Sequence, residues 1–214
     1  MNQIILQQTL PEVFVVRDPL PSDIWQQDII FSKGEKHLIE AASGTGKSSL
    51  CSYLYGYRND YRGTIRFDDT DIRSFATTDW VATRQRTLSI LFQDLRIFPE
   101  LTALENVQLK NRLTGHKTEE EILALFGALG IADKVHSTAG KISFGQQQRV
   151  AFIRSLCQPF DFILLDEPIS HLDDENARIM AEILLAEATT QNAGILVTSI
   201  GKNLPLDYTY IWKL

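Results

Sequence analysis

The segment HLIEAASGTGKSSL, residues 37–50, decides the fold class of this chain. It joins an apolar, strand-like run to a glycine-rich turn and then to a helix that is expected from about Lys47, with Leu50 and Leu54 facing the core. The glycines of the turn allow the backbone to approach a ligand closely. Because a helix N-terminus also favours negative charge, the segment predicts a loop that wraps phosphates between a strand and a helix.

Each residue of this loop has an expected role in holding a nucleoside triphosphate. Backbone N–H groups in the loop would turn toward phosphate oxygens, Lys47 would reach the β and γ phosphates, and Ser48 would bind Mg²⁺. Ala41 stands where the pattern G-x-x-x-x-G-K-[ST] has its first glycine, which is acceptable if that position needs no positive φ. The alternative is a plain turn. The expected nucleotide-binding residues are Ser43, Gly44, Thr45, Gly46, Lys47, Ser48 and Ser49.

A second motif, FILLDEP at residues 162–168, ends an apolar run with two adjacent carboxylates. The run predicts a strand buried on both faces, and ligands of α/β sheets bind at the carboxyl ends of such strands. Asp166 is expected to hold Mg²⁺ through water, and Glu167 is expected to polarise the attacking water as a general base. Taken alone, the motif is equally compatible with a strand that ends in a solvated acidic turn.

Composition narrows the protein class. The 214 residues are 44% hydrophobic and 22% charged, enough for one large domain or a core with a small lobe. A net charge of −6 argues against a protein whose main partner is nucleic acid. Cys51 and Cys157 lack metal-type spacing and are not expected to pair, which favours a reducing compartment. The first residues do not form a signal peptide, and no run is long enough to span a bilayer.

Strand-like and helical patterns alternate at both ends of the chain, with a helical stretch between them. This order predicts an α/β core that carries a helical lobe. The expected strands are Val13–Val16, 29–31, 36–40, 63–67, 162–165, 194–199 and a last one within 208–214, and the expected helices begin at about Lys47, fill most of 101–158 and cover 175–188.

Five motifs in order resemble those of the ATP-binding cassette (ABC) family. They are the phosphate loop at 41–49, ILFQD with Gln93, ISFGQ at 142–146, LLDEP at 164–168 and SHLD at 170–173. The family's usual signature is LSGGQ, so Ile142 and Phe144 depart from it. The stretch FQDLRIFPELTALENV also resembles cassettes that serve lipoprotein release, macrolide efflux and cell division.

The resemblance implies a P-loop NTPase core of ABC ATPase type with an inserted helical subdomain and an N-terminal β subdomain. The core would comprise about 1–93 and 159–214, and the helical subdomain about 94–158. The cofactors would be ATP and Mg²⁺, and two cassettes would dimerise with each signature facing the partner's nucleotide. The catalytic residues would be Glu167, Gln93 and Ser199, further nucleotide contacts would come from Ser143, Gly145, Gln146 and Asp173, and the metal would be held by Ser48, Gln93 and Asp166.

Two departures from the family pattern bear on catalysis. Ser199 stands where relatives usually carry a histidine that contacts the γ-phosphate, and losing such a contact typically costs about 10²- to 10³-fold in turnover. An alternative function is therefore an ATP-binding dimerisation switch with weak or absent hydrolysis. The residue that stacks on adenine stays unassigned, since Phe14 and Trp25, the nearest candidates, fit a core equally well. His171 is expected to pack near the dimer interface.

The resemblance also implies partners. The chain would work as a homodimer or paired cassette, on separate transmembrane permease subunits, in the cytoplasm at the inner face of the membrane. The short stretch between Ser199 and the last expected strand leaves little room for the usual helix there. A chromosome-maintenance cassette is disfavoured because no coiled coil is inserted between Lys47 and Ile142.

Overall fold

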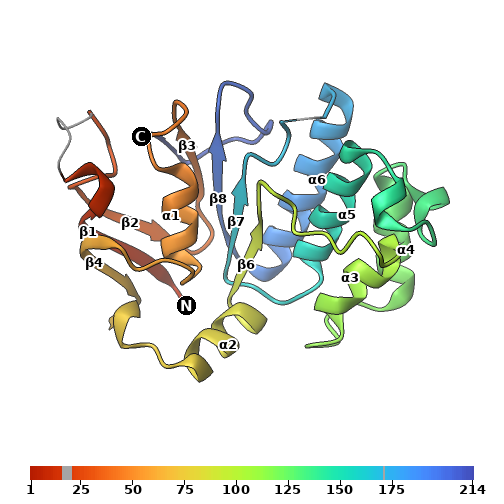
Figure 1. Cartoon of the computed structure of the whole chain (residues 1–214), viewed down its shortest axis with the longest axis horizontal. Coiled ribbons are helices and arrows are strands. Elements are labelled where there is room, and N and C mark those ends of the chain that lie inside the picture. The colour runs from red at the N-terminus through yellow and green to blue at the C-terminus, as the bar shows by residue number, and fades with distance from the viewer. Residues whose placement is uncertain (16–20, 171) are drawn as a thin grey trace.

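The computed structural model describes residues 1–15, 21–170 and 172–214, which form two sheets with helices around them (Figure 1). The strands are β1 Gln3–Pro11, β2 Asp28–Ser32, β3 Lys36–Glu40, β4 Tyr61–Phe67, β5 Thr70–Asp71, β6 Leu88–Leu91, β7 Phe162–Asp166, β8 Gly194–Ser199 and β9 Tyr210–Lys213. The α-helices are α1 Lys47–Leu54, α2 Thr77–Arg86, α3 Ala103–Asn111, α4 Glu119–Ala128, α5 Phe144–Leu156 and α6 Asp174–Gln191. Short 3₁₀ turns occupy Glu12–Phe14, Ile72–Ser74, Ala132–Lys134 and Ala139–Lys141.

The central sheet is parallel and has the strand order β6-β7-β8-β3-β9. All its carboxyl ends therefore lie along one edge, where ligands of α/β sheets bind (Figure 1). Strand β7 is buried at every residue, as its apolar run predicts. Phe162 and Leu164 join the core on the α1 side, while Ile163 and Leu165 join the core on the α5 and α6 side.

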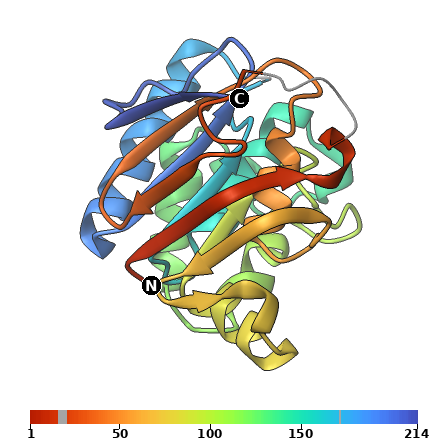
Figure 2. The same ribbon diagram turned by 90° about the vertical axis from the view of Figure 1, so that its left-hand side faces the viewer.

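A second, antiparallel sheet has the order β2-β1-β4-β5 and lies in front in Figure 2. One core lies between the two sheets and includes α1, with Leu50, Tyr53 and Leu54 buried in it. The other face of the parallel sheet is covered by α5 and α6, and α3 and α4 extend this second core outward. The α/β fold with an N-terminal β region and a helical region is therefore confirmed.

The structure corrects the predicted element at Val13–Val16. Residues Glu12–Phe14 form a 3₁₀ turn after Pro11 ends β1, and Val16 lies outside the described residues. Pro11 has a φ of −55°, fixed by its ring and less extended than that of a regular strand, so β1 ends there and the chain turns. Strand β1 and helix α2 were not predicted; α2 has no buried residue and hence no apolar periodicity to reveal it.

Several other predictions are confirmed. The helix beginning at Lys47 and the strands 36–40 and 194–199 have the predicted boundaries. Residues 200–209 contain no helix. Cys51 and Cys157 are buried free thiols.

Candidate active site

The turn after β3 depends on two glycines. Gly44 has a φ of +82° and Gly46 a φ of +104°, values that favour glycine. A Cβ on Gly46 would also lie 3.0 Å from both Phe14 Cε2 and Trp25 Cζ2. Ala41 does not have a positive φ, which explains why alanine is tolerated at this position.

Trp25 holds this turn from the core side. It is buried, and its indole Nε1 donates to the carbonyl of Thr45 at 2.9 Å. The Thr45 hydroxyl in turn donates to the carbonyl of Ala42 at 2.9 Å. Trp25 is therefore a core residue that supports the backbone of the loop.

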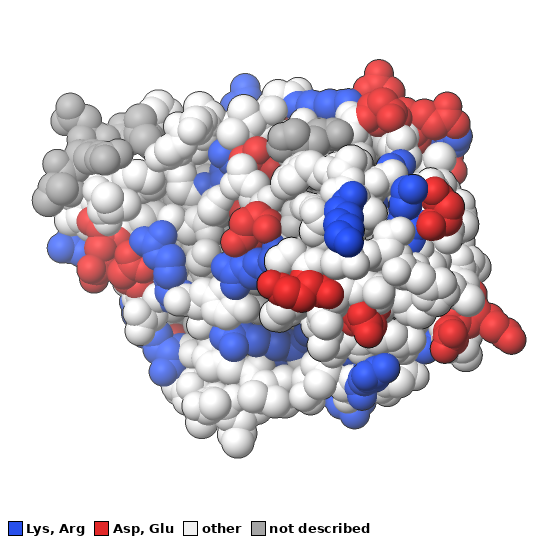
Figure 3. Space-filling model, turned by 45° about the vertical axis from the view of Figure 1, so that its right-hand side comes forward, with Lys and Arg blue, Asp and Glu red and all other residues white. Residues whose placement is uncertain are grey.

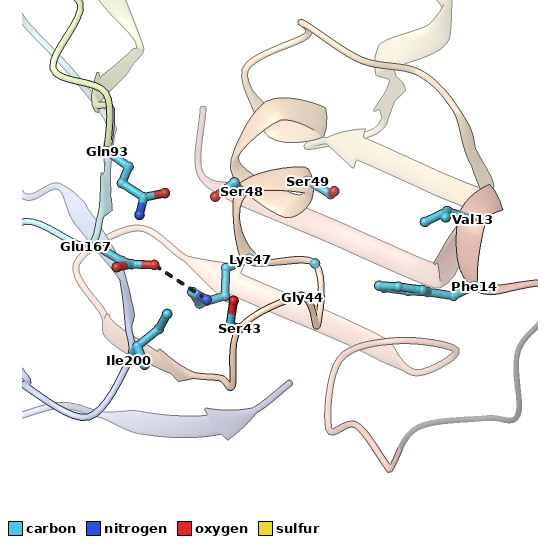
Figure 4. A pocket seen from close by; sticks show the side chains of 11 residues that line it. Val13, Phe14, Ser43, Gly44, Lys47, Ser48, Ser49, Gln93, Glu167 and Ile200 are labelled. Carbon is cyan, nitrogen blue, oxygen red and sulfur yellow. Dashed lines mark ion pairs between the residues drawn. The ribbon is translucent and has the colours of Figure 1, made fainter.

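Lys47 is the buried cation of the site. Its Nζ lies 3.5 Å from Oε1 of Glu167 and donates to the carbonyl of Ala42 at 3.3 Å (Figure 4). The side chain of Glu167 is 12% exposed, so the pair is only weakly screened by solvent. This arrangement places a positive charge beside the turn and a carboxylate opposite it.

The two carboxylates after β7 have different surroundings. Asp166 is buried, and its Oδ1 accepts a hydrogen bond from the hydroxyl of Thr198 in β8 at 2.6 Å. The Glu167 N–H donates to the carbonyl of Thr198 at 3.2 Å, and Glu167 has a φ of +51°. Because the backbone turns at Glu167, Asp166 stays at the end of β7 while the side chain of Glu167 points toward Lys47.

These elements surround a cavity of about 440 Å³. Gln93, which follows β6, extends into the space next to Ser48 and Glu167 (Figure 4). The cavity is lined by Val13, Phe14, Ser43, Gly44, Gly46, Lys47, Ser48, Ser49, Gln93, Glu167 and Ile200. The structure thus brings together most of the residues predicted from the phosphate loop, the glutamine loop and the acidic strand end. Val13 and Ile200 were missed, because neither has chemistry or spacing that marks it.

The residues at this edge fit Mg²⁺ by their chemistry. The hydroxyl of Ser48, the amide of Gln93 and the carboxylate of Asp166 are all oxygen donors, which Mg²⁺ prefers. Among the described residues, no group of three or more His, Cys, Asp and Glu side chains is arranged to hold a metal. Mg²⁺ is usually bound through one or two carboxylates together with substrate phosphates, so a complete protein cage is not required.

Ser199 does not line the cavity. It is 2% exposed, and its hydroxyl donates to the carbonyl of Lys202 at 2.6 Å. Its neighbour Ile200 faces the cavity instead. The hydroxyl of Ser199 therefore organises the turn after β8, and the structure does not bring it to the other predicted catalytic residues.

The predicted signature residues also lie outside the cavity lining. Ser143 is the N-cap of α5: its hydroxyl accepts from the N–H of Gln146 at 3.3 Å, and the Gln146 side chain accepts from the N–H of Ser143 at 2.9 Å. Both ends of this capping box satisfy N–H groups of the first helical turn. Ser143 is exposed and Gly145 half-buried, so this helix start is open to a partner.

Asp173 is likewise a cap and not part of the cavity lining. It precedes α6 and accepts from the backbone N–H of Asn176 at 2.8 Å and from the Asn176 side chain at 2.7 Å. These hydrogen bonds lower the pKa of Asp173. The predicted packing residue His171 lies outside the described residues.

The ABC transporter family model matches residues 26–170, more than half of the chain, and includes every motif from the phosphate loop to the acidic strand end. The chain belongs to the ABC transporter family. This confirms the resemblance drawn from the five ordered motifs, and it makes the two-sheet architecture that of an ABC cassette.

Curated relatives of this cassette include transporter ATP-binding proteins. The uncharacterized ABC transporter ATP-binding protein Rv0073 of Mycobacterium tuberculosis is 31% identical over 179 residues, which are 81% of this chain and 53% of that protein. The lipoprotein-releasing system ATP-binding protein LolD of Buchnera aphidicola is 27% identical over 78% of this chain and 74% of that protein. The chain thus spans about half the length of some curated relatives and most of others.

A solved structure has the same fold. A dimeric bacterial ABC transporter cassette, MJ0796, superposes with a TM-score of 0.76 at 23% identity, covering 91% of this chain and 87% of the other. At this identity the likeness supports the cassette fold alone.

No helix within the described part of the chain combines the length and apolar character needed to cross a membrane. On the face in Figure 3, acidic and basic side chains are interspersed and do not form one broad basic field. That pattern agrees with the acidic net charge of −6.

Proposed function

We propose that this cassette binds and hydrolyses ATP as the ATPase subunit of an ABC transporter. The observation that carries the proposal is the cavity in which Lys47, Ser48, Gln93 and Glu167 face one another at the carboxyl edge of the parallel sheet. A cation, a hydroxyl, an amide and a carboxylate in this arrangement match the needs of phosphoryl transfer to water, which relies on positioning and charge stabilisation.

In this proposal the loop from Ser43 to Ser49 holds the triphosphate. Backbone N–H groups and the N-terminus of α1 would contact phosphate oxygens, and Lys47 would move its charge from Glu167 to the β and γ phosphates. Thr45 supports the loop through two hydrogen bonds: its hydroxyl donates to the carbonyl of Ala42, and its carbonyl accepts from the indole N–H of Trp25. Phe14 lines the cavity beyond Gly44 and is our candidate for contact with the adenine of ATP (Figure 4).

Glu167 is the proposed general base. Release of its contact with Lys47 when phosphate enters would leave its carboxylate free to orient and deprotonate the attacking water. Gln93, which lies next to Glu167 in the cavity, would orient the same water. Ser48, Gln93 and Asp166 are the proposed metal-binding residues, and bound Mg²⁺ would neutralise charge that develops on the phosphates.

The nucleotide site of one chain is proposed to be completed by a second cassette. Ser143, Gly145 and Gln146 stand at an open helix N-terminus that does not line the chain's own cavity, and a partner's γ-phosphate is an anion that such a terminus stabilises. Asp173 would contribute at the same interface. The solved relative MJ0796 is described as a dimer.

The proposal for the wider assembly is supported by membership of the ABC transporter family. We propose separate transmembrane permease subunits as the partners, with the cassette on the cytoplasmic side of the membrane, and no nucleic acid partner. We also retain the division into a core of about 1–93 and 159–214 and a helical subdomain of about 94–158, which holds α3, α4 and α5.

A second candidate function is an ATP-driven dimerisation switch with slow hydrolysis. The observation that favours it is the position of Ser199, whose hydroxyl is bonded to the Lys202 carbonyl, so no side chain at this position reaches the cavity. A histidine contact to the γ-phosphate would then be missing from both sites of a homodimer.

The test is phosphate release by the purified protein with ATP, in the presence and absence of Mg²⁺, with oligomeric state followed on the same samples. The transporter ATPase predicts Mg²⁺-dependent release. ATP-dependent dimerisation without measurable release would favour the switch, and failure to bind ATP would reject both functions.

A further inference from the structure

Two turns beside the candidate active site have left-handed backbone at residues other than glycine. Glu167 has a φ of +51°, and Leu95 and Arg96, just after Gln93, have φ angles of +56° and +48°. Residues that carry a Cβ rarely adopt such φ angles, and this backbone conformation persists only where the surrounding structure holds it. Glu167 and Gln93 therefore lie in or next to turns that need external support.

The turn at Glu167 is supported by Gln148 in α5. The Gln148 Nε2 donates to the carbonyl of Pro168 at 2.6 Å, and the side chain is 2% exposed. Its Oε1 is buried without a hydrogen-bond partner among the described residues. Burying an amide that is only half satisfied is unfavourable, so an apolar side chain would pack here at lower cost. The bond to the catalytic turn is the contact that distinguishes glutamine from such a residue.

The turn after Gln93 is supported by Arg154, two turns further along the same helix. Its guanidinium donates to the carbonyl of Leu95 and, at 2.8 Å, to the carbonyl of Arg96. The planar fork of arginine spans two consecutive carbonyls, which a single ammonium group does less well. Burial lowers the pKa of Arg154, although its guanidinium stays charged.

Helix α5 is itself held firmly in place. Its N-terminus carries the exposed Ser143, whereas near its other end Ser89 in β6 donates to the carbonyl of Ser155. The interior of the helix is packed in the core through Val150, Ala151, Phe152 and Ile153. Close packing of this kind keeps the helix in a fixed position, from which its side chains can support both turns.

We propose that α5 is a brace for the active site, in which Gln148 positions Glu167 and Arg154 positions Gln93. The inference rests on the proposed function and deepens it by naming the residues that hold the general base and the water-orienting amide in position.

The experiment uses Gln148→Met and Arg154→Met, which remove the donors and keep most of the side-chain volume. Gln158→Met is the matched control. Gln158 is also fully buried, donates through Nε2 to the carbonyl of Leu88 at 3.3 Å, and also has an Oε1 without a partner among the described residues. Its bond reaches the start of β6, away from both catalytic turns. Thermal unfolding of each variant checks that it is folded.

The first readout is amide hydrogen exchange of the full chain without nucleotide. The brace predicts faster exchange at 167–170 in Gln148→Met and at 94–98 in Arg154→Met, by about tenfold, because local opening costs less free energy once the support is gone. Gln158→Met should change neither segment. Unchanged exchange at both turns would overturn the proposal.

The second readout separates kcat from KM for ATP. Both test variants should lower kcat by about tenfold or more with KM within about threefold, since the phosphate loop is untouched. Arg154→Lys should recover part of the loss, because the lysine ammonium can still donate to at least one of the two carbonyls. If exchange at the two turns is faster but kcat equals that of Gln158→Met, the positioning role would be overturned. Absence of hydrolysis in the wild type would reject the proposed function, while exchange would still decide whether α5 holds the turns.

Discussion

The Nζ of Lys47 lies 3.5 Å from Oε1 of Glu167, across a cavity that both residues line. The lysine comes from the first turn of α1 and the glutamate from the turn after β7, so two elements far apart in sequence meet as an ion pair. The pair compensates a buried cation, and in the proposed function phosphate would take the place of the carboxylate.

Removing Lys47 should weaken ATP binding strongly. Hydrogen bonds to charged groups contribute about 1.5–3 kcal/mol each, so Lys47→Ala should raise the Kd for ATP by about 10- to 100-fold. Isothermal titration with ATP measures the change. Lys33→Ala is the control, because Lys33 pairs with Asp161, which does not line the cavity. Equal losses in the two variants would contradict the role given to Lys47.

Gly46→Ala should disrupt the phosphate loop beyond the cost of its backbone angle. A positive φ costs an alanine about 1–2 kcal/mol, and the new Cβ would also press on Phe14 and Trp25 at 3.0 Å. Gly115→Ala is the matched control, since Gly115 has a φ of +62° with no atom within 4 Å of the added Cβ. Urea unfolding should show a loss at Gly46 that exceeds the loss at Gly115 by about 1–3 kcal/mol. Equal losses would show that the close approach is unimportant.

Ser199→Ala should affect stability more than turnover. The hydroxyl is bonded to the carbonyl of Lys202, a contact that contributes about 1 kcal/mol. Turnover should stay within about threefold of the wild type, because the side chain makes no contact inside the cavity. A large fall in kcat with an unchanged unfolding midpoint would show that Ser199 reaches the nucleotide after all.

The buried His37 should make stability depend on pH in the mildly acidic range. Burial lowers the pKa of His37 from 6.5 to about 4, partly offset by Glu35. Between these values the unfolded chain binds a proton that the folded chain does not, so stability falls as pH drops from about 6.5 toward 4. At pH 5 this amounts to about 2 kcal/mol relative to pH 7.5.

Urea unfolding at the two pH values tests this dependence. His37→Gln keeps an acceptor for the indole N–H of Trp212, which donates to Nδ1 of His37 at 3.2 Å. This variant should lose less stability on acidification than the wild type. Equal losses would mean that other groups cause the acid sensitivity.

Much of the fold follows from local patterns that the sequence displays openly. The apolar run of β7 and the glycine turn before Lys47 specify a buried strand and a strand-to-helix loop almost independently of their surroundings. Helix α2 could not be found in this way, because it buries no residue and is held by tertiary contacts such as the bond from Arg84 to the carbonyl of Tyr55.

In the candidate site, too, some features follow from local sequence patterns and others depend on tertiary contacts. Lys47 and Glu167 were identified because their motifs carry phosphate chemistry, and Gln93 was identified through the resemblance to the ABC family. All three line one cavity. Ile200 faces the cavity, whereas the hydroxyl of Ser199 bonds to the carbonyl of Lys202. Both positions depend on how the chain turns after β8, and no local sequence pattern encodes that turn. The same limit applies to the donors of α5, whose partners lie on distant loops.

The most direct test of the account compares phosphate release by the wild type and Glu167→Gln with Mg²⁺ and ATP, while dimerisation is followed by light scattering. Glu182→Gln, on the exposed side of α6, is the control. The wild type and Glu182→Gln should release phosphate, whereas Glu167→Gln should be slower by about 10²-fold or more and should accumulate as an ATP-bound dimer. Release by Glu167→Gln at the wild-type rate would contradict the assignment of Glu167 as the general base.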